Sequence, residues 1–115
     1  MYSEERWKEI ADLTDGMALD GVWHYVIRDF KALPEARLAF LWIIGKLLQE
    51  ERIKLAKHGV FLEGSPERLV QLFRETLPTA EEDVASIGGI ENWFFAEECP
   101  GGAVWMREDG TEEWT

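Results

Sequence analysis

The segment that follows Pro34 constrains the fold of this chain most strongly. Proline suits the first turn of a helix, and Glu35 beside it favours the positively polarised helix N-terminus. The residues from Pro34 to about Arg52 therefore predict the longest helix, and its centre, Phe-Leu-Trp-Ile-Ile, is apolar nearly all round. Because such a helix has no wide polar face to turn to water, we expect the other elements to pack around it.

Shorter amphipathic helices are predicted on both sides of this central helix. Ser3 is placed to cap a first helix, and Asp20 to cap a second one with a single apolar face. Ser65, followed by proline, is placed to cap a fourth helix. Thr79 and Glu82 match a capping box, which predicts a short fifth helix that ends before Gly88 and Gly89.

Two turn signals predict short β-hairpins near residues 53–63 and 103–114. His58-Gly59 favours a two-residue turn that pairs Lys57 with Val60, the histidine tolerating a positive φ. Asp109-Gly110 also favours a two-residue turn, which would place Trp105 opposite Trp114 and both rings on one face. The same register would place Arg107 opposite Glu112.

Together these elements predict an α+β fold, with four to five helices packed around a central apolar helix. The 115 residues are near the commonest domain size, and the sequence contains no internal repeat or low-complexity linker. We therefore expect a single globular domain over residues 1–115. The N-terminus lacks the pattern of a secretory signal, and the apolar stretch from Leu38 to Leu48 is too short to cross a bilayer, which favours a cytoplasmic protein without a membrane partner.

Negative charge is concentrated at the C-terminal end of the chain. Residues 1–80 have a net charge of −2, whereas residues 81–115 have a net charge of −9, and the whole chain has −11. Such a field repels nucleic acid and attracts a basic partner. The alternative is that the acidity only keeps the protein soluble.

The acidic residues of this last third are interleaved with aromatic residues, a combination typical of tight protein interfaces. Trp93, Phe94 and Trp105 are also natural core residues, and among the rings we expect Trp114 to be partly exposed. The predicted partner-binding residues are Glu97, Glu98, Glu108, Asp109, Glu112, Glu113 and Trp114, with Glu81, Glu82 and Asp83 as a second patch.

Catalytic and metal-binding motifs are absent from the sequence. The two histidines, His24 and His58, form no zinc-binding spacing, and we expect no metal and no cofactor. We expect His24 to be solvated on a polar helix face. Cys99, next to Glu97 and Glu98, is predicted to be a structural thiol with a raised pKa.

Two segments, KLAKHGVFLEGS and WFFAEECPGGAVWMREDGTEEWT, resemble a bacterial family known as domain of unknown function 596. The most specific parts are the turn around His58-Gly59, the Trp-Phe-Phe block, the Glu-Cys-Pro segment and the terminal Trp-Thr. The resemblance implies a shared fold and no established activity. In size, acidity and aromatic content the chain is also similar to immunity proteins that neutralise bacterial toxins, including those of contact-dependent growth inhibition systems.

The leading hypothesis is therefore an acidic immunity or inhibitor protein that binds a basic toxin domain, such as a nuclease, by presenting carboxylates where phosphates would lie. Two alternatives stay open. One is a small enzyme that uses a carboxylate with His24 or His58. The other is a structural subunit of a homo-oligomer, with the tryptophan face of the terminal hairpin buried between copies.

Overall fold

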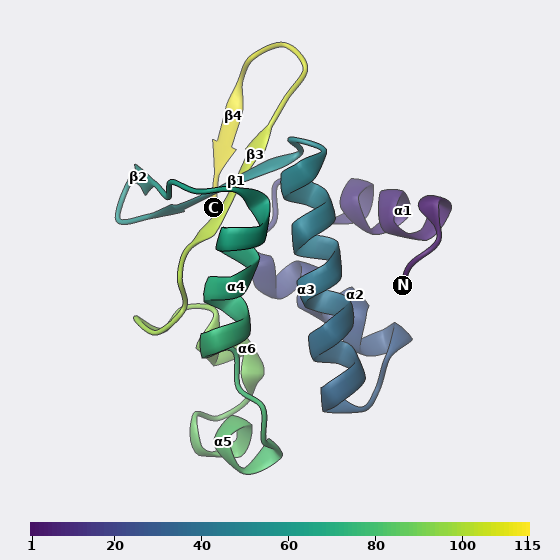
Figure 1. Ribbon diagram of the computed structural model, residues 1–115, viewed down its shortest axis with the longest axis vertical. Coiled ribbons are helices and arrows are strands. Elements are labelled where there is room, and N and C mark those ends of the chain that lie inside the picture. The colour runs from purple at the N-terminus through teal and green to yellow at the C-terminus, as the bar shows by residue number, and fades with distance from the viewer.

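Helix α3 (Leu33–Gln49) lies at the centre of the helical part of the molecule (Figure 1). It packs against α2 (Leu19–Asp29) and α4 (Pro66–Thr76), and Phe40 lies among three aromatic rings at the middle of the core. Residues of α3 are buried on several sides of the helix, as its composition predicted. They are Leu33, Ala36, Ala39, Phe40, Leu41, Ile43, Ile44, Gly45, Leu47 and Leu48.

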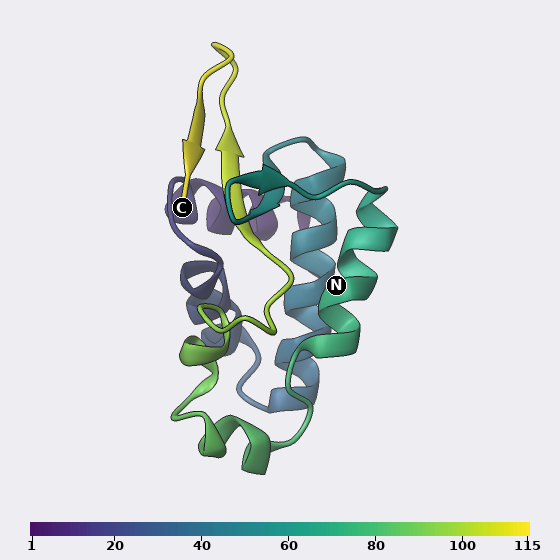
Figure 2. The same cartoon turned by 90° about the vertical axis from the view of Figure 1, so that its left-hand side faces the viewer.

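The computed structural model describes all residues from 1 to 115 and has an α+β fold, which confirms the predicted class. Six helices accompany one antiparallel sheet of four strands in the order β2-β1-β3-β4 (Figures 1 and 2). The remaining elements are α1 (Glu4–Thr14), β1 (Ile53–Lys57), β2 (Val60–Phe61), α5 (Glu81–Ser86), α6 (Ile90–Trp93), β3 (Gly102–Met106) and β4 (Glu112–Trp114). None of the helices is long and apolar enough to cross a bilayer.

The predicted serine caps are confirmed, and the other two predicted caps are wrong. The hydroxyl oxygens of Ser3 and Ser65 each accept a hydrogen bond from a backbone N–H of the first helical turn. Asp20 lies inside α2, which begins at Leu19, so its charge favours the helix N-terminus without capping it. Thr79 lies one residue before the N-cap of α5, too early for a capping box.

Helix α6 was not predicted from the sequence. It follows Gly88 and Gly89, which have φ values of 82° and 118° and end α5 as expected. With only four residues it is too short for a periodic pattern. It places Trp93 and the following Phe94 against the core, where Phe94 lies 5.3 Å from Phe40 between ring centroids.

The two hairpins join into one sheet because β1 pairs with β3, with Ile53 opposite Trp105 and Leu55 opposite Ala103. These four side chains share the face that is buried in the core. The first hairpin has the predicted register, with Lys57 opposite Val60. His58 has the expected positive φ, 53°.

The second hairpin has a different register from the predicted one. Trp114 lies opposite Val104, and Glu112 lies opposite Met106 rather than Arg107. A two-residue turn of the favoured type needs a positive φ at both central residues, and here only Gly110 has one, 87°. The loop therefore contains three residues, closed by a hydrogen bond from the Arg107 N–H to the Thr111 carbonyl (2.9 Å).

This shift of one residue separates the two tryptophans that were expected on one face. Trp105 points into the core and is fully buried, whereas Trp114 lies on the outer face of the sheet and is 44% exposed. There Trp114 meets Phe61 from the opposite edge strand, at 4.9 Å between ring centroids. The two rings meet across a sheet whose central strands carry the small residues Ala56 and Gly102 at this point.

Candidate protein-binding site

The β3–β4 hairpin projects beyond the body of the molecule (Figures 1 and 2). Every residue from 108 to 115 is exposed. At its base, the Trp105 indole N–H donates to the Met17 carbonyl between α1 and α2 (2.8 Å). The hairpin is therefore an anchored projection that presents its outer part to solvent.

Arg107 supports the anchor by joining the hairpin to the end of α1. Its guanidinium lies 3.0 Å from the Glu113 carboxylate and 3.4 Å from the Asp15 carboxylate. Arg107, the one arginine of the hairpin, thus forms ion pairs with two carboxylates. Neither Glu108 nor Glu112 forms an ion pair, so their charges face solvent.

Asp109 has a structural role in the turn. Its carboxylate accepts hydrogen bonds from the Thr111 hydroxyl (2.6 Å) and the Thr111 N–H (3.0 Å). These hydrogen bonds, the hydroxyl one first, lower the pKa of Asp109 below its ordinary value. The carboxylate therefore keeps its charge to lower pH and holds the loop that sets the register.

Trp114 is a partly exposed ring that is held in place. Its indole N–H donates to the Glu112 carboxylate at 3.2 Å, and its ring packs against Phe61. The Lys54 ammonium lies 5.2 Å from the centre of the Phe61 ring, within cation–π range. The predictions that Trp114 is partly exposed and that Trp93, Phe94 and Trp105 cover the core are confirmed, and the most exposed ring of the acidic third is Phe95, at 71%.

The structure places the other predicted partner-binding residues elsewhere. Glu81, Glu82 and Asp83 form the first turn of α5, at the opposite end of the molecule from the tip of the hairpin (Figure 1). Glu97 and Glu98 precede β3, and both are exposed. The predicted residues therefore divide into three separate groups, and only the hairpin group combines carboxylates with an exposed indole ring.

Glu97 pairs with residues of the first hairpin. Its carboxylate lies 3.2 Å from Nε2 of His58 and 3.6 Å from Nζ of Lys57. The hydrogen bond with His58, followed by the charge of Lys57, lowers the pKa of Glu97. This histidine–carboxylate pair is open to water, with 71% and 76% of the two side chains exposed.

Cys99 is buried beside this pair, and its thiol lies 3.4 Å from the Gly101 carbonyl. Burial raises its pKa, which agrees with the predicted direction but not with the predicted cause, the charges of Glu97 and Glu98. A neutral buried thiol packs as a small apolar side chain. His24, expected to be solvated, is exposed on α2.

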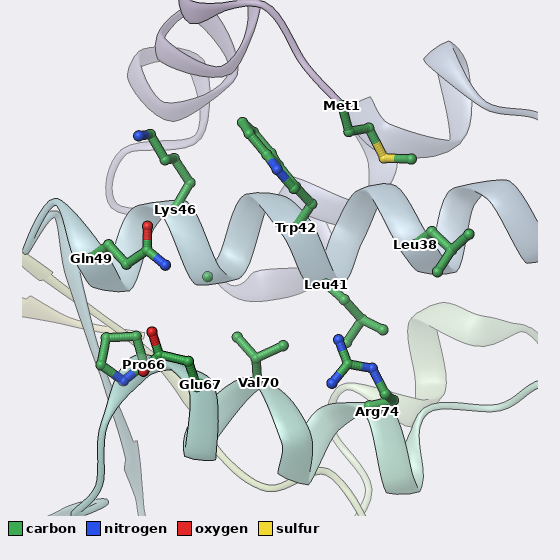
Figure 3. A pocket seen from close by; sticks show the side chains of 11 residues that line it. Met1, Leu38, Leu41, Trp42, Lys46, Gln49, Pro66, Glu67, Val70 and Arg74 are labelled. Atoms are coloured by element: carbon green, nitrogen blue, oxygen red, sulfur yellow. The ribbon is translucent and has the colours of Figure 1, made fainter.

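The two large hollows of the surface do not gather catalytic groups. One, of about 700 Å³, lies between the outer face of the sheet and α4, and its lining contains no histidine, cysteine or serine. The other, a groove of about 630 Å³, lies between α3 and α4, with Leu41 and Val70 at its floor and charged side chains along its rims (Figure 3). Its lining contains no histidine, cysteine or serine. No group of three or more histidine, cysteine, aspartate or glutamate residues is arranged to hold a metal ion.

Fold and site together define a small α+β protein with a helical core, a four-stranded sheet and an acidic terminal hairpin. The family described as "Protein of unknown function, DUF596" matches residues 48–115, and the chain belongs to this family. A solved structure titled an uncharacterized protein conserved in bacteria, from Neisseria meningitidis, is similar over 96% of this chain and 88% of its own. The TM-score is 0.85 and the sequence identity 29%. A comparison with curated proteins finds no match.

Proposed function

We propose that this protein is an acidic binding protein of the cytoplasm, an immunity or inhibitor protein that neutralises a basic bacterial toxin domain by direct contact. The observation that carries the proposal is the anchored hairpin, which presents Glu108 and Glu112 without cationic partners beside the exposed Trp114 ring. Unpaired carboxylates attract a basic surface, and an indole ring supplies buried contact area.

A nuclease is the toxin class that fits this surface best. An enzyme that cleaves nucleic acid holds phosphates with lysine and arginine side chains. Carboxylates on a projecting hairpin reach such a site as phosphate mimics, whereas the net charge of −11 keeps nucleic acid itself away from the inhibitor. Binding then blocks the active site without any chemistry by the inhibitor.

The test is affinity capture from a lysate of the source organism, at low and at high salt, with the wild type and two charge-matched variants. One variant changes Glu108 and Glu112 to lysine, which leaves the turn residue Asp109 and the arginine partner Glu113 in place. The control changes Glu81 and Glu82 to lysine on α5, which has no buried residue. Each pair of substitutions removes two negative charges and adds two positive ones, which changes the net charge from −11 to −7, so the two variants differ only in where the charge changes.

The proposal expects one basic protein to be retained by the wild type and by the α5 variant, lost by the hairpin variant, and released by about 1 M salt, where screening acts within about 3 Å. The purified partner should have a toxic activity that the wild type blocks in a stoichiometric mixture. Equal capture by both variants, or a partner that is not basic, would contradict the proposal.

An enzyme is the second candidate, because His58 and Glu97 lie within hydrogen-bond distance of each other. Proton transfer in catalysis depends on groups whose pKa values are pushed apart, which burial achieves best, and both side chains here are mostly exposed. A Glu97→Gln substitution separates the two functions. It would remove an activity that depends on the pair and would leave capture through the hairpin unchanged.

A homo-oligomer held by a tryptophan face is less well supported. Trp105 is already buried within the single chain, so it has no surface to offer a second copy. Light scattering at micromolar concentration should therefore give the mass of one chain, 13.3 kDa.

A further inference from the structure

The outer edge of β4 is an unpaired strand edge. Strand β4 is the last strand in the order β2-β1-β3-β4, so only one of its two sides is hydrogen-bonded. It contains no proline, which would remove a backbone donor, and its two glutamates disfavour pairing with another acidic strand. Its backbone is therefore open to pairing with another strand.

The register shows which backbone groups are open. In an antiparallel pair, hydrogen-bonded and non-hydrogen-bonded residue pairs alternate. Thr111 accepts from the Arg107 N–H, and the Thr115 N–H donates to the Ala103 carbonyl, so the odd-numbered residues of β4 face β3. The N–H and C=O groups of Glu112 and Trp114 consequently point away from the sheet.

The opposite edge of the sheet has fewer unpaired backbone groups. Strand β2 contains only Val60 and Phe61, and the Leu62 N–H is already bonded to the Leu55 carbonyl. By the same alternation, only Phe61 presents its backbone groups outward there. An added strand could therefore form backbone hydrogen bonds with one residue at the β2 edge and with two residues at the β4 edge.

A second copy of this chain does not fit the β4 edge. If two copies paired these outward groups in the antiparallel sense, each Glu113 would lie directly opposite the Glu113 of the other copy. Like charges at directly opposite positions destabilise a sheet. Glu113 shares the single charge of Arg107 with Asp15, so this group keeps a net negative charge. A strand carrying lysine or arginine at that position would compensate this charge, so the charge of β4 favours a basic strand.

We propose that the β4 edge binds an extended basic segment of the partner protein as a fifth strand of the sheet, held by the backbone of Glu112 and Trp114. Glu112 and Trp114 share the outer face, so the side chains that the added strand places there would lie beside the indole ring and the Glu112 carboxylate, and its basic side chains on the other face would lie beside Glu113. This inference rests on the proposed function, because it specifies how a basic partner binds the hairpin.

Hydrogen exchange with a defined probe tests this geometry. The probe is the capped peptide acetyl-Arg-Val-Lys-Val-Arg-Val-Lys-amide, and the control peptide has the same charges with proline in place of each valine, which removes alternate backbone donors. On addition of the probe, the amides of Glu112 and Trp114 should become protected from exchange. The amides of Glu113 and Thr115, which already face β3, should change little.

A substitution at Glu112 tests the same point from the protein side. Proline is tolerated in an edge strand where its nitrogen faces solvent, so Glu112→Pro removes an outward N–H and keeps the β3–β4 ladder. Glu112→Gln removes only the charge. Loss of one hydrogen bond predicts that Glu112→Pro binds the probe roughly threefold to tenfold more weakly than Glu112→Gln.

The outcomes separate this inference from the proposed function. Protection of both amides by the probe, with weaker binding of the proline peptide, supports strand addition. Equal, salt-sensitive binding of the two peptides without protection overturns strand addition and leaves the acidic interface standing. If neither peptide binds the hairpin at millimolar concentration, both proposals fail.

Discussion

Two adjacent glycines before the terminal hairpin are predicted to respond in opposite ways to the same substitution. An added Cβ at Gly101 would lie 2.8 Å from the Ala56 carbonyl oxygen and 3.1 Å from a methyl group of Leu62. At Gly102 the nearest atom would be the Thr115 hydroxyl oxygen, at 3.7 Å, an ordinary contact. Neither glycine has a positive φ, so backbone strain does not distinguish Gly101→Ala from Gly102→Ala.

The difference between the two variants measures the steric cost directly. Replacing glycine by alanine restricts the unfolded chain in both variants and stabilises the fold by about 0.4–1 kcal/mol where the alanine fits. This gain cancels in the comparison. Because the close atom at Gly101 belongs to the backbone of β1, the strand must move, and overpacking of this kind costs about 1–3 kcal/mol. We expect Gly102→Ala to be neutral or stabilising and Gly101→Ala to be less stable than Gly102→Ala by that amount.

Urea denaturation followed by circular dichroism measures both free energies of unfolding. At roughly 4 °C per kcal/mol for a chain of this size, the melting temperatures should differ by about 4–12 °C. Equal m-values would show that the two variants unfold from equally compact states. Equal stability of the two variants, or a more stable Gly101→Ala, would refute the close approach of the segment before β3 to β1.

Three further predictions concern single side chains. His58→Gly should keep the stability of the wild type, whereas His58→Val should lose about 1–2 kcal/mol in thermal unfolding, because only the glycine accepts the φ of 53° without strain. The lowered pKa of Asp109 means that its stabilising effect is present above the ordinary pKa of aspartate and is lost as the pH falls through the lowered value. NMR of the Thr111 amide should therefore show an acid transition that Asp109→Ala lacks. Buried Cys99, whose pKa is raised, should react with a thiol reagent at neutral pH only as fast as the protein unfolds, and rapid reaction of the folded protein would contradict its burial.

The helical part of the fold was largely predictable from the sequence because its signals are local. The apolar segment after Pro34, the two serine caps and the break at Gly88-Gly89 each depend on a few neighbouring residues. The pairing of β1 with β3 depends on residues about 50 positions apart, and no local pattern encodes it. The prediction of two hairpins was therefore correct, while their union in one sheet was not foreseen.

The register of the terminal hairpin shows how a small local choice changes the site. The dipeptide Asp109-Gly110 is compatible with a two-residue or a three-residue loop, and the hydrogen bonds from Thr111 to Asp109 favour the longer one. The shorter loop would have placed both tryptophans on one face. The longer one buries Trp105 and leaves Trp114 beside Phe61 on the outer face.

The distribution of the acidic residues also decides how their charge can act. Most of the negative charge of the last third of the chain, net −9, lies in the three separate groups of acidic residues. Helix α5 lies at the opposite end of a molecule 43 Å long from the hairpin tip. At physiological salt, charges more than about 8 Å apart across solvent are largely screened from each other. Charge at α5 can therefore affect the rate of approach at low salt, whereas a direct contact at Glu112 affects how long a partner stays bound. If the hairpin is the interface, the lysine variant of α5 should change mainly the association rate, and the lysine variant of the hairpin should also raise the dissociation rate.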